Sequence, residues 1–342
     1  MQKINWGIIG LGSIALQFSK SFSQIQNANL LGVASRNESK LKKFGEHFNI
    51  EKKFLFKNYQ DLIECEEIDI VYISLPNSLH KHWVIKAIKN NKHILVEKPA
   101  TINYSEANEI KDHLKTTNLF FSEAFMYRYH PQINSIIEVI KKNKIGNPSS
   151  MESFCGKNIL TKKKFFFFEK RKKIDPKSRM FKKELGGGCI LDLGCYPLSF
   201  SLFVGSLINK QNIDNIKILN IKKEIGETGV DVDSYAELIF QDGFKSKIYA
   251  SFKKNLGNQS IIKGENGSII INNTWFGGNL VLKINDKSDQ IISFETIPNI
   301  YAYQVKEISN QLIEGIRKPK FPVMNLHETL LNMQIIEDWV SF

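Results

Sequence analysis

Two polar side chains stand out in the apolar stretch GGGCILDLGCYP at residues 186–197. Asp192 and Tyr196 lie one helical turn apart, so a helix over 190–203 would place both on one face. A tyrosine hydroxyl, with its ordinary pKa near ~10, can protonate the oxygen of a carbonyl that accepts hydride, or take the proton of an alcohol in reverse. A neighbouring carboxylate could bind substrate hydroxyl groups. The same spacing also suits a helix N-terminal acid and a core tyrosine.

Lys98 is a third residue that could take part in catalysis. It follows the apolar run His93 to Val96 in the sequence Glu97-Lys98-Pro99. Its head group is then expected to be partly desolvated, whereas a surface lysine in a turn is the simple alternative. Near a nicotinamide, the lysine could hold a substrate oxygen and supply positive charge as hydride moves. A lysine placed next to a tyrosine could also favour the ionised form of the phenol.

A glycine-rich turn near the N-terminus predicts a dinucleotide-binding site. The sequence GLGSIA at residues 10–15 follows a short apolar run from Lys3 to Ile9 and precedes a stretch compatible with a helix up to Phe22. This is the GxGxxG/A fingerprint in a strand, turn and helix context, where the helix N-terminus supplies amide donors for a pyrophosphate. We therefore expect cofactor contacts from Gly10, Gly12, Ser13 and Ile14.

The end of the next predicted strand indicates which dinucleotide binds. Asn29 to Ala34 arrives at the expected distance of ~20 residues from the glycines, and it leads into Ser35 and Arg36. An acid at this position would hold a ribose 2′-hydroxyl, whereas arginine suits a 2′-phosphate. Ser35, Arg36 and Lys40 favour NADP, and NAD stays possible because Glu38 lies close by.

Strands and helices continue to alternate up to residue 122, which predicts a doubly wound parallel sheet. The expected strands are 68–74, 93–96 and 119–122, and the expected helices are 80–90 and 105–116. Ligands bind such sheets beyond the carboxyl ends of the strands. The loops at 74–77 and 97–99 occupy these ends, so we expect cofactor contacts from Leu75, Asn77, His80, Glu97 and Lys98. A helix-capping role is an alternative for His80.

Beyond residue 122 the pattern changes to runs of strands. We predict an N-terminal Rossmann domain over 1–122 and a C-terminal α+β domain over 123–342, whose large sheet is mostly antiparallel. The residues 241–243, Gln-Asp-Gly, predict a hairpin between two alternating strands. The expected strands of this domain are 151–155, 215–223, 234–240, 245–252, 260–263, 268–271 and 281–284, and the expected helices are 131–142, 190–207, 303–317 and 327–340.

Composition narrows the function classes. The chain has 342 residues, 42% of them hydrophobic and 24% charged, as expected for a folded protein of two domains. No segment approaches the ~18 apolar residues of a membrane span, so we expect a cytoplasmic protein. Neither the four cysteines nor the histidines have metal-ligand spacing, so we expect no metal. The net charge of +12 is scattered, although dense lysine runs flank 165–168; these could be solvated loops, a substrate or subunit surface, or a polyanion site.

Five motifs in order resemble one enzyme family. The segments GLGSIA, LPNSLH, VEKPA, EAFMYRYHP and RMFKKELGGGCILDLGCYP are similar to those of the glucose-fructose oxidoreductase/inositol dehydrogenase/rhizopine catabolism (Gfo/Idh/MocA) family. They look most like its glucose-fructose oxidoreductase and dimeric dihydrodiol dehydrogenase branch, and the resemblance covers nearly the whole chain. It implies that Lys98 is catalytic and that Asp192 and Tyr196 lie at the substrate. Many relatives carry histidine where this chain has Tyr196, which argues against inositol dehydrogenase activity. The resemblance also implies an open sheet face that forms a homodimer or a dimer of dimers.

We therefore predict an NADP- or NAD-dependent enzyme that transfers hydride between nicotinamide and a secondary alcohol or carbonyl. The substrate would be a sugar, a sugar derivative or a cyclic diol. A non-catalytic NADP-binding regulator is the alternative. Nucleic acid is not an expected partner, because only the net charge suggests it, and no membrane partner is expected. Arg128 is expected to be structural or substrate-adjacent, and Arg179 to form a salt bridge or contact substrate.

Overall fold

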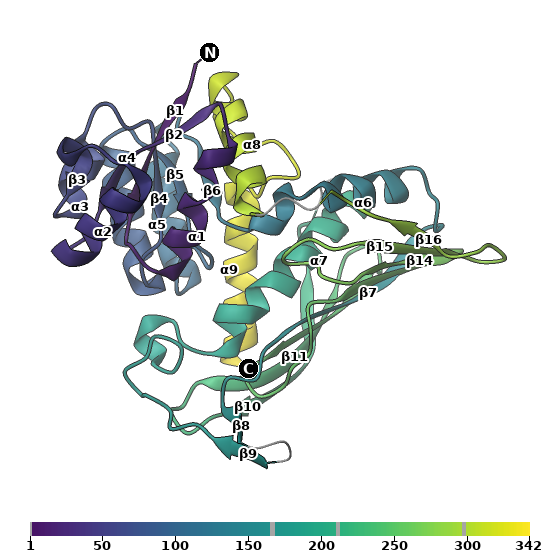
Figure 1. Ribbon diagram of the computed structural model, residues 1–342. Helices are drawn as coiled ribbons and strands as arrows, with labels where there is room; N and C mark the ends of the chain where they lie inside the picture. The colour runs from purple at the N-terminus through teal and green to yellow at the C-terminus, as the bar shows by residue number, and fades with distance from the viewer. Residues whose placement is uncertain (1, 165–167, 210–212, 296–298) are drawn as a thin grey trace. The chain divides into compact units, whose positions relative to one another are not determined.

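The computed structural model describes residues 2–164, 168–209, 213–295 and 299–342, which form two compact units (Figure 1). The first unit comprises Met1–His130 and Ile297–Leu330, and the second comprises Pro131–Thr296 and Leu331–Phe342. This division differs from the boundary predicted after residue 122. The segment 123–130 and a long C-terminal segment belong with the N-terminal sheet, so the chain returns to its first unit near its end.

The first unit is built on a six-stranded parallel sheet with the strand order β3-β2-β1-β4-β5-β6. The predicted doubly wound fold is thereby confirmed. Its strands are β1 (Ile4–Ile9), β2 (Ala28–Ala34), β3 (Leu55–Phe56), β4 (Ile70–Ile73), β5 (His93–Val96) and β6 (Phe121–Glu123). Its helices are α1 (Ser13–Ser19), α2 (Glu38–Phe48), α3 (Tyr59–Glu64), α4 (His80–Lys89), α5 (Tyr104–Leu114) and α8 (Tyr301–Ile313).

Asparagine caps fix where three of these helices begin. The side chains of Asn37, Asn58 and Asn103 each accept a hydrogen bond from the backbone amide three residues later, at 2.8–2.9 Å. Such a cap satisfies one of the amides that a helix N-terminus leaves without a partner, and is worth about 1 kcal/mol. Because the caps of α2 and α3 close the loops after β2 and β3, they also set where residues 35–37 lie.

Aromatic packing explains why α8 belongs to the first unit. Phe18 of α1 stacks on Tyr72 of β4 with ring centroids 3.9 Å apart, and it also contacts Tyr301, the first residue of α8. Trp6 of β1 is fully buried, and its indole nitrogen donates to Ser309 Oγ of α8 at 3.0 Å. The sheet thus needs α8 to cover this aromatic surface. Chain order alone had assigned α8 to the second domain.

The second unit contains an eight-stranded sheet with the order β10-β11-β12-β7-β13-β14-β15-β16. All its pairs are antiparallel except the parallel pair β7–β12, as the predicted α+β architecture requires. The hairpin predicted at 241–243 joins β11 to β12. The strands are β7 (Pro148–Gly156), β10 (Lys217–Ile225), β11 (Asp231–Ile239), β12 (Lys245–Ser251), β13 (Ser260–Gly264), β14 (Gly267–Ile271), β15 (Leu280–Ile284) and β16 (Gln290–Ile292).

Some short strands were not predicted. Besides β16, a separate two-stranded sheet pairs β8 (Thr161–Lys164) with β9 (Phe168–Arg171). Lysine-rich sequence disfavours strand formation, so composition gives little signal for β8. The stretch 165–168, which the lysine runs flank, lies mostly outside the described residues.

One face of the large sheet packs against helix α7 (Cys195–Ile208), on which α6 (Pro131–Lys141) packs in turn, and α9 (Leu326–Ser341) contributes Trp339. Alternate residues of β11 and β12, such as Ala236 and Ile248, are fully buried. The expectation that no segment approaches the length of a membrane span is corrected: among the described residues, one helical stretch, Lys183–Ile208, is long and apolar enough to cross a membrane, although 78% of its most apolar window is buried. Burial on all sides is what a core helix requires, and that is how α7 is used here.

Arg128 has a structural role in the first unit. Its guanidinium is fully buried and contacts Glu328 Oε1 at 2.9 Å, the Pro322 carbonyl at 3.1 Å and the Tyr127 hydroxyl at 3.0 Å. These bonds connect the segment after β6 to Pro322, which precedes α9, and to Glu328, which lies in the first turn of α9. Of the two roles considered from sequence, the structural one accounts for these contacts.

Removing one partner of this buried ion pair is expected to destabilise the protein by roughly 3–5 kcal/mol, because the other charge is left unpaired. Arg128→Met and Glu328→Leu should each show this loss in urea unfolding at neutral pH. The double variant should be considerably more stable than the sum of the two losses predicts. Single-variant losses below about 1 kcal/mol would contradict the assigned role.

Candidate active site

The glycine turn after β1 is shaped by close contact with the end of β4. Gly10 has φ +90°, and a Cβ there would lie 2.8 Å from Leu75 Cδ2 and 2.9 Å from the Ser74 carbonyl oxygen. The Ser74 hydroxyl donates to the Gly10 carbonyl at 2.7 Å. Only glycine satisfies both the backbone angle and the contact. The predicted loops at 10–15 and 74–77 therefore do meet at the carboxyl edge of the sheet.

The start of α1 is open in the way a bound pyrophosphate requires. Gly12 is exposed, precedes α1 without a side-chain cap, and would place a Cβ more than 4 Å from any other atom. Ser13 is also exposed and Ile14 is half-buried. Nearby in the next loop, Asn77 is buried and its Nδ2 has no hydrogen-bond partner among the described residues. A donor without a partner and a helix start without a side-chain cap fit an anionic dinucleotide.

The residues after β2 form a short, partly basic corner. Ser35 is buried, and its hydroxyl accepts the Asn37 amide at 3.1 Å. Arg36 is exposed and its guanidinium carbon lies 5.1 Å from the centroid of the Tyr59 ring. Lys40 is exposed in the first turn of α2, and Glu38 is paired with Lys57 at 2.9 Å. Glu38, the acid that kept NAD possible, is therefore paired with a lysine of its own.

The loop that carries Lys98 is joined to the loop after β4 by a buried histidine. His80 Nε2 lies 2.7 Å from the Leu75 carbonyl and Nδ1 lies 3.0 Å from the Pro99 carbonyl. Lys98 itself is half-buried, and the adjacent Glu97 carboxylate accepts a hydrogen bond from the Tyr72 hydroxyl. Both ring nitrogens of His80 thus face backbone carbonyls, which gives it a loop-holding role; its contact with a cofactor stays a prediction.

Glu123 was not identified from sequence, although an acid inside the apolar run FFSEAF was a usable signal. It is fully buried at the end of β6, in register with Val96, and its Oε1 accepts the Ala100 amide at 3.0 Å. Burial raises the pKa of this carboxyl to about 7, and the Ala100 amide and the Lys98 charge oppose the rise. Glu123 therefore closes the Lys98 loop from the side opposite His80.

In the second unit, Asp231 explains the glycine triplet. Its Oδ1 accepts the Ile190 amide at 2.7 Å, and a Cβ on Gly188 would lie 2.4 Å from its Oδ2. Gly188 and Gly186 have φ of +115° and +76°, respectively. A Cβ on Gly187 would lie 2.8 Å from the Lys182 carbonyl oxygen. Each glycine is thus required by backbone angle or by close approach.

The helix that follows is not α-helical from its start. Residues Ile190–Gly194 form a π-helical turn, and α7 begins only at Cys195. The Asp192 carbonyl accepts a hydrogen bond from the Cys195 thiol at 3.7 Å. The uniform α-helix expected over 190–203 is therefore corrected. Single π-turns inside helices are rare and occur often at functional sites.

The two side chains that drew attention in the sequence have different partners. Asp192 is mostly buried and its Oδ1 pairs with Arg179 Nη1 at 3.2 Å. Tyr196 is half-buried with its ring centroid 5.4 Å from that of Trp275. The salt bridge considered for Arg179 is present, and it connects to a predicted site residue.

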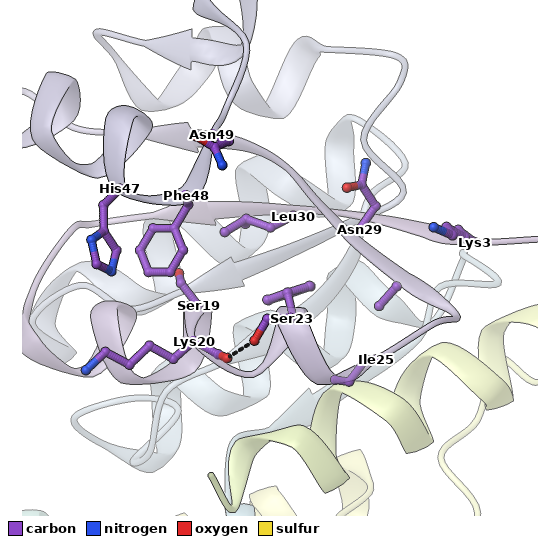
Figure 2. A pocket seen from close by; sticks show the side chains of 12 residues that line it. Lys3, Ser19, Lys20, Ser23, Ile25, Asn29, Leu30, His47, Phe48 and Asn49 are labelled. Atoms are coloured by element: carbon purple, nitrogen blue, oxygen red, sulfur yellow. Dashed lines mark hydrogen bonds between the residues drawn. The ribbon is translucent and has the colours of Figure 1, made fainter. Parts of the chain in front are cut away.

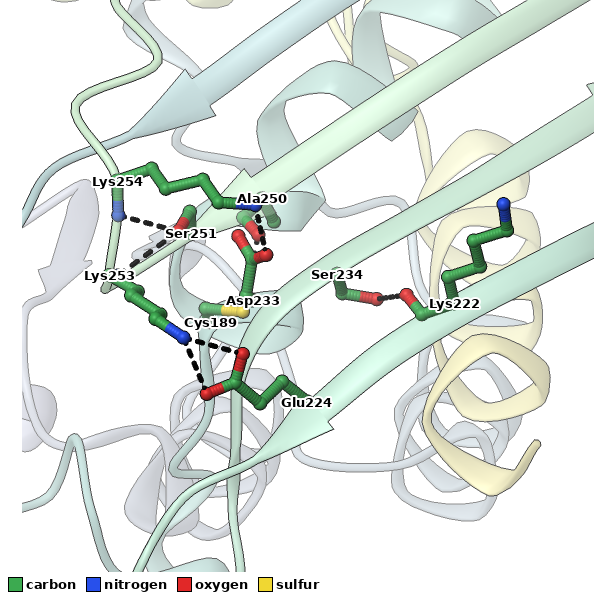
Figure 3. A network of polar contacts seen from close by, with 9 residues as sticks. All are labelled: Cys189, Lys222, Glu224, Asp233, Ser234, Ala250, Ser251, Lys253 and Lys254. Atoms are coloured by element: carbon green, nitrogen blue, oxygen red, sulfur yellow. Dashed lines mark hydrogen bonds and ion pairs between the residues drawn. The ribbon is translucent and has the colours of Figure 1, made fainter.

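Polar contacts around the turn fix its surroundings. Figure 3 shows Lys254 beside Asp233 and Lys253 beside Glu224, close to Cys189. The two ion pairs have N–O distances of 2.5 Å and 2.8 Å, and the Cys189 thiol donates to the Ala250 carbonyl at 3.5 Å. Burial raises the pKa of the Cys189 thiol far above its usual value, so it stays protonated and is no nucleophile. Within the described part of the chain, no three His, Cys, Asp or Glu side chains gather as a metal site would need.

A well-formed cavity of the first unit lies elsewhere. About 560 Å³ in volume, it is lined by the ends of α1 and α2 and by residues at the starts of β1 and β2, among them Ser19, Leu30 and Phe48 (Figure 2). This is the amino edge of the sheet, whereas cofactors of doubly wound folds bind at the carboxyl edge. We therefore do not assign it to the active site.

Gly188→Ala is expected to lower the free energy of unfolding by roughly 2–4 kcal/mol, because it adds backbone strain and a clash with Asp231. Gly229→Ala is the matched control, since Gly229 has φ +81° but no atom within 4 Å of a Cβ. The control should lose only about 1 kcal/mol. Equal losses in urea unfolding would show that the Asp231 contact is unimportant.

Glu123→Gln is expected to change how stability depends on pH. With its pKa raised to about 7, Glu123 takes up a proton on folding, so its contribution falls as pH rises from about 5 to 8, by roughly 3 kcal/mol in total. The Gln variant should lack this fall, and its unfolding free energy should exceed that of wild type increasingly toward pH 8. A wild-type minus variant difference that stays constant between these pH values would refute the raised pKa.

Comparison with known proteins agrees with this architecture. Residues 4–125 match the model of an oxidoreductase family with an NAD-binding Rossmann fold, and residues 133–270 match the GFO/IDH/MocA C-terminal domain. A trans-1,2-dihydrobenzene-1,2-diol dehydrogenase of Xenopus tropicalis is 25% identical over 97% of this chain and 96% of its own length. A glucose-6-phosphate 3-dehydrogenase of Bacillus subtilis is 31% identical over 73% of this chain and 67% of its own length.

A solved structure shares the fold over nearly the whole chain. The 3-ketoreductase of Actinomadura kijaniata, crystallised with NADP and TDP-benzene, superposes with a TM-score of 0.81 at 20% identity, covering 98% of this chain and 96% of its own. The relatives are dehydrogenases and reductases, and the predicted enzyme class is thereby confirmed. Since the family models cover most of the chain, this protein belongs to the GFO/IDH/MocA family of NAD(P)-dependent oxidoreductases.

Proposed function

We propose that this oxidoreductase transfers hydride between NADP and a secondary alcohol or carbonyl of a sugar, a sugar derivative or a cyclic diol. The observation that carries the proposal is the half-buried Lys98, held at the carboxyl edge of the Rossmann sheet by His80 and Glu123. The substrate class rests on relatives whose names specify a diol, a glucose phosphate and a nucleotide-linked deoxysugar.

The preference for NADP rests on the corner after β2. A 2′-phosphate there would meet the Ser35 hydroxyl and the Arg36 guanidinium, with Lys40 one turn into α2. Arg36 lies over Tyr59, which orients its planar group and reduces the entropy lost on binding. Glu38, the acid that would favour NAD, is already paired with Lys57. Gly12 and the first amides of α1 would hold the pyrophosphate.

Catalysis is assigned to three residues. The nicotinamide, when bound, supplies or accepts the hydride. Reduction of a carbonyl also consumes one proton, which the Tyr196 hydroxyl would deliver to the developing alkoxide. Lys98 would stabilise the negative charge on that oxygen, and Asp192 would bind a neighbouring hydroxyl. Solved variants of the 3-ketoreductase, with a lysine replaced by alanine and a tyrosine by phenylalanine, concern the same two residue types.

Tyr196→Phe is expected to lower kcat by roughly 10²–10⁴-fold, because the proton donor is lost while the ring is kept. The dissociation constant for NADPH should stay within about twofold of wild type, since the tyrosine belongs to the substrate site. Tyr235→Phe is the matched control, because that hydroxyl is bonded to Glu237 on the large sheet. Steady-state kinetics with a carbonyl substrate and fluorescence titration with NADPH provide the two readouts. An unchanged kcat would show that Tyr196 is not the proton donor, whereas a wild-type protein that binds NADPH but turns over no carbonyl compound would favour the non-catalytic regulator.

A further inference from the structure

The segment that leads into the glycine turn carries an unusual excess of positive charge. Between residues 170 and 183 there are eight basic residues and a single acid, Asp175. All eight are exposed: Lys170, Arg171, Lys172, Lys173, Lys177, Arg179, Lys182 and Lys183. Eight positive charges and one negative charge give this segment +7 of the chain's net +12, so this local density needs its own explanation.

Backbone hydrogen bonds hold the end of this segment against the turn that begins the site helix. The Gly188 amide donates to the Met180 carbonyl and the Gly187 amide to the Lys182 carbonyl, both at 3.0 Å. Residues 179–183 therefore wrap around the glycines. Their positive charges lie beside the π-turn that carries Asp192, within the same compact unit.

Arg179 connects this charge to the site itself. Its Nη1 lies 3.2 Å from Asp192 Oδ1, and its side chain is 45% exposed while that of Asp192 is 11% exposed. A guanidinium has five N–H donors in a planar fork, and this ion pair engages one nitrogen. Solvent exposure lets the other edge of the fork approach a ligand while the pair with Asp192 persists. A carboxylate or a phosphate, which offers two oxygens side by side, is the ligand that such a fork fits best.

We propose that the substrate carries an anionic group, a phosphate or a carboxylate, which Arg179 binds next to Asp192, with the basic segment 170–183 attracting it. The proposal rests on the function proposed above and narrows its substrate class. A neutral polyol would gain nothing from eight cations. For an anion, a field of this sign raises association rates by roughly 10–10³-fold, and salt near 0.1 M would weaken the effect because the Debye length falls to about 10 Å.

The test is calorimetric titration of the full-length, NADP-saturated protein at low ionic strength. The probes are the 6-phosphates and the uronates of glucose, galactose and mannose, together with the three parent sugars. We expect at least one phosphate or uronate to bind tenfold or more tightly than its parent sugar. If only the sugar phosphates bind more tightly than their parent sugars, the recognised anion is a phosphate. If only the uronates do, it is a carboxylate. Added salt should reduce this preference but leave the binding of neutral sugars unchanged.

Variants locate the effect. Arg179→Gln should weaken anion binding at least tenfold and leave parent-sugar binding within twofold, and Arg179→Lys should restore part of the loss. Lys287→Gln is the control, because it also removes one positive charge. Lys287 lies in the exposed turn after β15, near the edge of the sheet opposite to β11, so this variant should bind anions and parent sugars as wild type does. The Gln variant is expected to fold, because Arg179 is exposed and the glycine turn is held by backbone hydrogen bonds and by Asp231.

Several results would overturn the proposal. Binding of phosphates, uronates and parent sugars with equal affinity, or equal losses in Arg179→Gln and Lys287→Gln, would do so. Retention of a DNA duplex that depends on segment 170–183, without any preference among the sugars, would assign the charge to a polyanion surface. Turnover of a neutral carbonyl compound with NADPH that Arg179→Gln does not change would support the proposed oxidoreductase function. It would contradict only the proposed anionic group of the substrate. Failure to bind either cofactor would instead contradict the proposed function.

Discussion

The carboxylate of Asp231 is the interaction on which the glycine turn of the second unit depends. It accepts the Ile190 amide at 2.7 Å, and it leaves no space for a side chain at Gly188. One buried acid on β11 thereby fixes both the end of the basic segment and the start of the site helix. The positions of Arg179 and Asp192 follow from that constraint, because the first lies just before the turn and the second just after it.

Buried polar groups serve the same purpose in the Rossmann unit. His80 and Glu123 each bond to backbone groups of the loop that carries Lys98, from two different neighbouring elements. A buried polar group without a partner costs roughly 1–3 kcal/mol, so these bonds hold the loop strongly in one geometry. Such support is what a catalytic side chain needs if it is to stay within a fraction of an ångström of its productive position.

The sequence predicted the parts of the fold that depend on local signals. The glycine fingerprint, the alternating strands and helices up to residue 116 and the hairpin at 241–243 all depend on near neighbours along the chain. Features that depend on tertiary contacts could not be predicted. The return of α8 to the first unit is decided by Trp6, Phe18 and Tyr72. The π-turn at 190–194, whose first amide donates to Asp231, was not predicted either.

The site was predicted in part for the same reason. Lys98 and the glycines were proposed because they follow strands at the expected binding edge, and a salt bridge for Arg179 was considered, although its partner Asp192 was not predicted. Glu123 and Asp231 were missed because their importance lies in which backbone amides they accept, and spacing carries no trace of that. Sequence reasoning is thus strongest for residues that face a ligand and weakest for those that hold them in place.

The most direct test of the central claim is fluorescence titration of the purified protein with NADPH and NADH, followed by addition of carbonyl sugars and diketones to each complex. The account predicts that NADPH binds at least tenfold more tightly than NADH, a difference of about 1.4 kcal/mol, and that at least one carbonyl compound oxidises the bound cofactor. Binding of neither cofactor by folded protein would contradict the account.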